Sequence, residues 1–93
     1  MTLHTLPDIA GSSTAVRLVA TSGLKARWIK VCSETGISNI GDASVSATQG
    51  VDCPVGVPVT LESNGADATD AYDLYNTWVW VPSGSTLTVT YGV

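Results

Sequence analysis

Phenylalanine is absent from this chain, histidine occurs once, and charged residues are scarce. Only 13% of the 93 residues are charged, about half the usual share for a soluble domain. Nucleic-acid binding depends on clusters of Lys and Arg, and a chain with four such residues and a net charge of −4 is expected to have no nucleic-acid partner. So low a charge also indicates that another molecule covers part of the surface.

Long apolar runs are missing as well. No segment approaches the ~18 consecutive apolar residues of a membrane-spanning helix, so no membrane partner is expected. The first residues, MTLHTLPDIAGSS, lack the basic and apolar regions of a secretory signal, which favours a protein made and used without export. Residues 1–93 are predicted to form one domain, because this length allows one modest core.

Groups suited to catalysis are few. The one histidine, His4, lies in a predicted N-terminal extension, so no Ser-His or Cys-His pair is expected in the core. Cys32 and Cys53 match no zinc spacing. Buried free thiols are favoured for them in a reducing cytoplasm, although the sequence leaves a disulfide open.

Three aspartates recur at every third position in the longest polar stretch. They are Asp67, Asp70 and Asp73. Carboxylates are the ligands that calcium prefers, but this spacing fails the pattern of a calcium loop, and helix caps or solvated charges explain it more simply. We therefore predict no enzyme activity, no cofactor and no metal site.

Alternation of period two, interrupted by turn residues, predicts an all-β fold. In the clearest strand, residues 26–33, Ile29 and Val31 lie on one face, and Trp28, Lys30 and Cys32 lie on the other. Further strands are predicted at residues 14–20, within 38–48, at 57–62, and in a terminal hairpin formed by WVWVPSGSTLTVTYGV. The prediction is a small antiparallel β-sandwich or jelly-roll-like domain of six to eight short strands, with residues 1–13 as an extended N-terminal arm.

Two stretches stand out within this pattern. NIGDASVSATQGV, residues 39–51, alternates small side chains between two glycines, which favours close approach of a sheet or a subunit. Trp78 and Trp80 lie two residues apart on a strand and so share a face, opposite Val79 and Val81. The two indoles are favoured as core or interface residues over a platform for stacking sugars, and both interpretations remain open.

The strand ARWIKV, the IGDASVSATQG element, the GVPVTL strand and the ending DLYNTWVWV followed by TLTVTY together resemble small β-rich structural proteins of tailed bacteriophages. The resemblance covers most of residues 26–93. The two cysteines and the paired tryptophans are not typical of that group, and it supplies no catalytic residues.

The resemblance implies a virion protein, in particular a decoration or cement protein that binds the major capsid protein on the surface of the assembled head, after synthesis in the host cytoplasm. By analogy a homotrimer is favoured over a dimer. The predicted assembly residues are Trp28, Trp78 and Trp80, with Leu6, Pro7 and Ile9 of the arm. The alternative is a carbohydrate-binding or fibre-associated or tail-associated β module that uses Trp78 and Trp80.

Overall fold

A computed structural model describes residues 3–62 and 72–93. Within these ranges the chain forms ten strands in three antiparallel sheets and one short 3-10 helix. The elements are β1 (Leu3–Ala10), β2 (Ala15–Arg17), β3 (Lys25–Ala26), β4 (Trp28–Ser33), β5 (Ser38–Gly41), β6 (Val51–Cys53), β7 (Val59–Glu62), β8 (Tyr72–Asp73), η2 (Leu74–Asn76), β9 (Trp78–Trp80) and β10 (Thr86–Gly92). The predicted all-β sandwich is confirmed.

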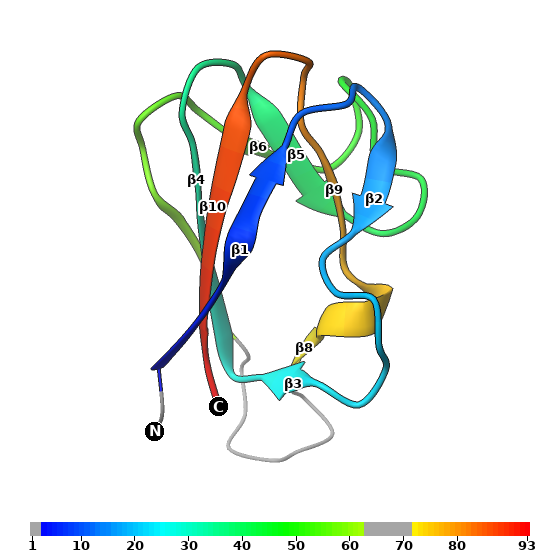
Figure 1. The fold of residues 1–93 in the computed structure, drawn as a ribbon, viewed down its shortest axis with the longest axis vertical. Coiled ribbons are helices and arrows are strands. Elements are labelled where there is room, and N and C mark those ends of the chain that lie inside the picture. The colour runs from blue at the N-terminus through cyan, green and yellow to red at the C-terminus, as the bar shows by residue number, and fades with distance from the viewer. Residues whose placement is uncertain (1–2, 63–71) are drawn as a thin grey trace.

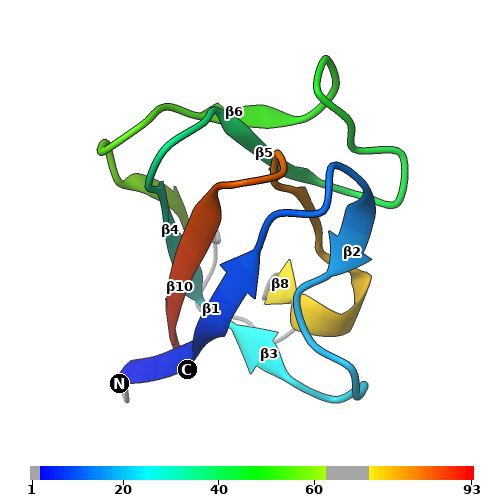
Figure 2. The ribbon, with the colours of Figure 1, turned by 45° about the horizontal axis from the view of Figure 1, so that its top comes forward.

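Two four-stranded sheets form the two layers. Sheet A has the order β1-β10-β4-β7, and sheet B has the order β2-β9-β5-β6. A two-stranded sheet, β3-β8, lies at one end of the sandwich, next to the 3-10 helix (Figure 1). The view in Figure 2 separates the layers, with β1, β10 and β4 on one side and β5 and β6 on another. The structure has more strands than the six to eight predicted, mainly because β3 and β8 have two residues each and are too short to produce a pattern in the sequence.

Sheet A presents an aliphatic face to the interior. Ile29 and Val31 of β4 are fully buried, and they pair with Tyr91 and Val89 of β10, which lie on the same face. The alternation predicted within residues 26–33 is confirmed for β4, where Lys30 lies on the opposite, exposed face. The predicted strand is not continuous, because Ala26 belongs to β3 and Arg27 separates the two strands. The aliphatic face supplies half of the core.

Sheet B supplies the other half. Val79 of β9 pairs with Val16 of β2 and with Ile40 of β5, and Val79 and Ile40 are fully buried. Val81 follows on the same face and is also buried. The interior between the sheets is therefore filled mainly by Val, Ile and Leu side chains, together with Cys53, Ala26 and Tyr91.

The predicted terminal hairpin is wrong. β9 pairs with β2 and β5 in sheet B, whereas β10 pairs with β1 and β4 in sheet A. The turn between them, in which Ser85 N donates to Pro82 O at 3.1 Å, carries the chain from one layer to the other. Crossing is favoured because Val79 and Leu87 then meet in one core from opposite sheets, and Pro82 has no N–H to continue a ladder.

The predicted N-terminal arm is built into the sandwich. Its residues Leu3–Ala10 form β1, the edge strand of sheet A, which pairs with β10 along most of its length. The register shifts between Leu6 and Ile9, where Pro7 interrupts the ladder. An apolar side chain on each side of this bulge packs against the core, which explains why the segment is docked and not extended away.

The segment at residues 38–48 was predicted to contain one or two strands, and only its first part is one. The strand ends at Gly41, and Asp42 then begins a turn in which its carboxylate accepts from Ser44 N at 2.9 Å and from Ser44 Oγ at 2.5 Å. These hydrogen bonds lower the pKa of Asp42. Residues 42–50 form a loop that folds back on β5, so that Val45 is buried against Gly41.

The crossing from β1 into sheet B requires a glycine. Gly11 N donates to Ser85 O at 2.9 Å, and a Cβ atom at residue 11 would lie 1.8 Å from the carbonyl oxygen of Pro82. Since that neighbour is backbone, no side-chain rotation relieves the clash.

Replacing Gly11 with Ala is expected to lower the midpoint of thermal unfolding by about 10 °C or more, because the β9–β10 turn must move away from residue 11. Circular dichroism of the strand signal during heating measures this change. The control is Ser22→Ala, at an exposed position. A Gly11→Ala midpoint as high as that of the control would contradict the close contact.

Candidate functional site

Trp78 and Trp80 lie on the same face of sheet B, as the alternation predicted, and the structure shows that this is the outer face. Antiparallel pairing places Arg17 beside Trp78, and it places Ala15 and Asn39 beside Trp80. Both indoles are half-buried. We name this surface, formed by Arg17, Asn39, Tyr75, Trp78 and Trp80, the tryptophan face.

Arg17 organises one end of the tryptophan face. Its guanidinium carbon lies 3.9 Å from the centre of the Tyr75 ring and 4.7 Å from the centre of the Trp78 ring. Its Nη1 also donates to Tyr75 O at 2.7 Å. Two aromatic contacts and a hydrogen bond fix the orientation of the guanidinium although Arg17 is exposed.

The 3-10 helix η2 places Tyr75 for this contact. Asp73 caps the helix by accepting from Tyr75 N at 3.1 Å, and its other carboxylate oxygen accepts from Asn76 Nδ2 at 2.9 Å and lies 3.5 Å from Lys25 Nζ. Leu74 is fully buried and anchors the helix to the core. The position of Tyr75 therefore depends on one cap and one buried side chain.

Asn39 closes the other end of the tryptophan face. It is 1% exposed, and its Nδ2 donates to Ala47 O of the 42–50 loop at 3.3 Å. Its Oδ1 is buried and accepts no hydrogen bond from the described residues. Gly50 permits the covering, because its φ of +121° suits glycine and a Cβ there would lie 2.7 Å from Val45 Cγ2. The loop thus limits the open area beside Trp80.

The other predicted assembly residues lie elsewhere. Trp28 is half-buried on the outer face of sheet A, so it does not join the other two tryptophans. Leu6 and Ile9 are partly buried against the core, and Pro7 is exposed at the bulge in β1. The structure brings Trp78 and Trp80 together and separates them from the remaining four.

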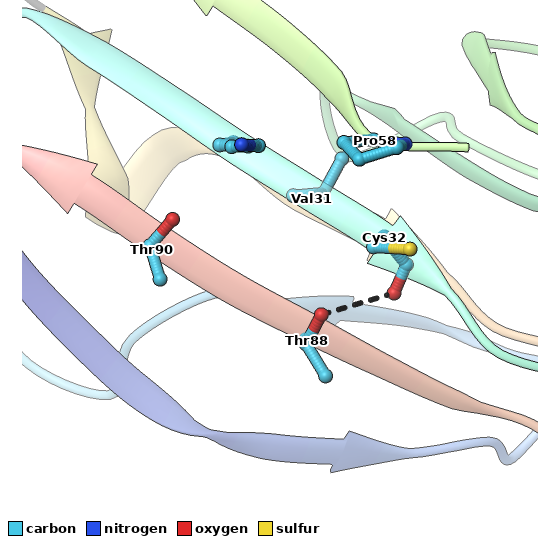
Figure 3. Close-up of a pocket in the computed structure, with 6 residues that line it drawn as sticks. Val31, Cys32, Pro58, Thr88 and Thr90 are labelled. Atoms are coloured by element: carbon cyan, nitrogen blue, oxygen red, sulfur yellow. Dashed lines mark hydrogen bonds between the residues drawn. The ribbon is translucent and has the colours of Figure 1, made fainter. Parts of the chain in front are cut away.

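The outer face of sheet A is rich in threonine. Register places Thr90 opposite Thr5 on one side and opposite Lys30 on the other, and Lys30 is opposite Thr60. A depression of about 210 Å³ lies on this face (Figure 3). Its lining consists of Lys30, Val31, Cys32, Pro58, Thr88 and Thr90. Thr88 Oγ1 donates to Cys32 O at 3.3 Å, and the lining holds no carboxylate or imidazole to serve as a general acid or base.

Metal-ligating groups do not gather in the part of the chain that the structure describes. No cluster of three or more His, Cys, Asp or Glu side chains occurs there. Asp67 and Asp70 lie outside the described residues, and Asp73 is the helix cap described above. The helical structure among the described residues is the single turn η2, which is too short to cross a membrane.

The two thiols are unpaired, as predicted. Cys53 is fully buried in the core, and Cys32 is half-buried on the threonine-rich face. Burial, together with the negative charge of Asp52 and the nearby Cys32, raises the pKa of the Cys53 thiol to about 11. Cys53 therefore acts as a small apolar core residue.

Comparison with family models, curated proteins and solved structures finds no match for this chain.

Three residues of the tryptophan face, Arg17, Asn39 and Tyr75, are not among the site residues predicted from the sequence. The available signal was the density of aromatic residues in YDLYNTWVW, in which Tyr75 precedes Trp78 by three positions. Arg17 gave no such signal, because it is 58 residues away from Tyr75 in the sequence and the two meet only through the pairing of β2 with β9.

Cys32 is expected to react with a thiol reagent before Cys53 in the native protein at pH 8, because Cys53 is buried and is almost entirely protonated there. Mass spectrometry of peptides after brief iodoacetamide treatment measures the order, and the denatured chain is the control. Equal labelling rates in the native protein would contradict the buried position.

The raised pKa of Cys53 also makes the stability of the fold depend on pH. The buried thiol favours the folded state below pH 9.0, and this contribution is lost as the pH rises toward 11.

Proposed function

We propose that this chain is a non-enzymatic decoration or cement protein, which binds the major capsid protein on the surface of an assembled phage head. The bacteriophage context comes from the resemblance of residues 26–93 to small phage structural proteins. The observation that carries an interaction role is the placement of the tryptophans. All three are half-buried on outer faces of the sheets, although indoles usually contribute to the core of so small a domain.

The physical chemistry of the tryptophan face supports a protein partner. Trp, Tyr and Arg are the residues that most often dominate the energy of protein interfaces, and here the Arg17 guanidinium contacts both Trp78 and Tyr75. Because their positions are fixed by strand pairing and by the capped helix, little conformational freedom is lost on binding. The mechanism is static bridging of neighbouring capsid subunits.

A repeated shell favours a symmetric, multivalent binder. Each copy then contributes a modest patch, and simultaneous attachment makes weak contacts persist. The proposal includes a homotrimer, whose mass in sedimentation equilibrium would be three times the 9.6 kDa of one chain. A species of one chain mass at all concentrations would overturn this part of the proposal.

The direct test is co-sedimentation with empty shells of the major capsid protein from the same genome. The wild-type protein is expected to pellet with the shells, and the double variant Trp78→Ala, Trp80→Ala is expected to bind at least about tenfold more weakly. The control is Thr60→Ala, an exposed substitution on sheet A. Absence of wild-type binding would overturn the capsid role, and unchanged binding by the double variant would exclude the tryptophan face.

Carbohydrate binding is the second candidate, because Trp78 and Trp80 are half-buried on one outer face and aromatic rings stack on sugars. The guanidinium of Arg17 already lies 4.7 Å from the Trp78 ring centre, which makes a platform of two open indoles less suitable for a sugar. Titration with a panel of bacterial polysaccharides is expected to leave tryptophan emission unchanged. A saturable shift in emission that the double variant lacks would establish the carbohydrate function instead.

A further inference from the structure

Arg17 holds a charge that the described part of the chain does not neutralise. Its Nη1 donates to Tyr75 O, and none of the described carboxylates lies within ion-pair distance of it. The guanidinium has five N–H donors in a planar fork, so most of them remain available. Arg17 is exposed, which leaves those donors accessible from solvent.

The nearest acid in the sequence around η2 serves another role. Asp73 accepts hydrogen bonds from Tyr75 N and Asn76 Nδ2 and is paired with Lys25. These contacts build the helix that carries Tyr75, so Asp73 supports the aromatic contact and does not compete for the guanidinium. The carboxylate of Asp73 is therefore engaged by Tyr75, Asn76 and Lys25, and Arg17 has no carboxylate partner among the described residues.

We propose that the guanidinium of Arg17, held between Tyr75 and Trp78, binds an Asp or Glu side chain of the capsid shell protein. This inference rests on the proposed capsid role and names the group that the shell must present. Arg pairs with a carboxylate through two parallel hydrogen bonds, which gives orientation as well as affinity. The indole of Trp78 and the ring of Tyr75 hold the fork in place before the partner arrives.

The net negative charge restricts an acidic partner surface to places where the protein presents a cation. The protein carries a net charge of −4, so an acidic partner surface is repelled except where a cation is presented. Arg17 supplies such a cation at a defined point of the tryptophan face, and contact there excludes water from the pair. A misplaced acidic surface would meet net repulsion, so the pair contributes to selectivity as well as to affinity.

Lys30 provides the matched comparison. It is also an exposed cation on an outer sheet face, but it lies on sheet A among threonines, and within residues 3–62 and 72–93 the structure shows no aromatic contact or hydrogen bond of its side chain. Lys30→Gln and Arg17→Gln remove the same charge from opposite faces of the molecule. Arg17→Lys keeps the charge and removes the planar fork.

The first experiment does not use capsid shells. The side-chain Nε–Hε signal of Arg17 and the indole N–H signals are followed by NMR during titration with acetyl-Glu-methylamide, and acetyl-Gln-methylamide is the neutral control. We expect the Arg17 and Trp78 signals to shift progressively with the concentration of the Glu compound alone, because a single exposed ion pair binds weakly. No shift at Arg17, or equal shifts with both compounds, would overturn the carboxylate site. The amide spectrum of each variant confirms that it is folded.

The second experiment compares untreated shells with shells whose carboxylates have been converted to amides by carbodiimide and glycinamide. Arg17→Gln and Arg17→Lys are each expected to bind untreated shells at least about tenfold more weakly than wild type, with Lys30→Gln changed less than about twofold. Wild type is expected to lose affinity for amidated shells, and Arg17→Gln is expected to be indifferent to the treatment.

The outcomes separate the two proposals. If the wild-type protein binds no shells, the capsid role fails, and the NMR titration alone decides whether Arg17 binds a carboxylate. If wild type binds shells and Arg17→Gln or Arg17→Lys binds equally well, the capsid role stands and the Arg17 inference is overturned. Equal losses for Arg17→Gln and Lys30→Gln would show attraction by general charge, which also overturns it.

Discussion

The aliphatic interior between sheets A and B is the constraint on which the other features depend. Ile29 and Val31 from one layer meet Val79 and Ile40 from the other, and all four are fully buried. Branched aliphatic side chains fill the space between two twisted sheets closely, and an indole added there would force the layers apart. The core therefore places the tryptophans on the outside, and the surface chemistry of the molecule follows from the packing of its interior.

Local alternation predicted much of this from the sequence. In β4 and in residues 78–81, the period of two correctly separates buried from outward side chains, because each strand has one face in the core. Sheet membership was not predictable in the same way. β9 and β10 look like a hairpin along the chain, but whether adjacent strands pair or cross to the other layer depends on partners far away in the sequence, such as β2 and β1.

The surface site shows the same division between local and long-range information. The shared face of Trp78 and Trp80 follows from their spacing, whereas the stacking of Arg17 requires the β2–β9 register and the cap on η2. In loop 42–50, the alternation of residues did not distinguish a loop from a strand. Its alternation of small residues suits a strand, yet the Asp42–Ser44 hydrogen bonds and the positive φ of Gly50 favour turns, and the buried Val45 then serves the loop's own packing.

Pairing of β1 with β10 joins segments from opposite ends of the described chain, with Leu3 opposite Gly92 (Figure 1). During synthesis β1 is made before the other described strands of the sandwich, and β10, with which it pairs, is made after them. Leu6 and Ile9 stay uncovered through that interval, and closing so long a loop carries an entropic penalty before any contact compensates for it. Sheet A can therefore be completed only after β10 has been made. Until then, Pro7 and the bulge in β1 disfavour pairing of this edge strand with a wrong strand.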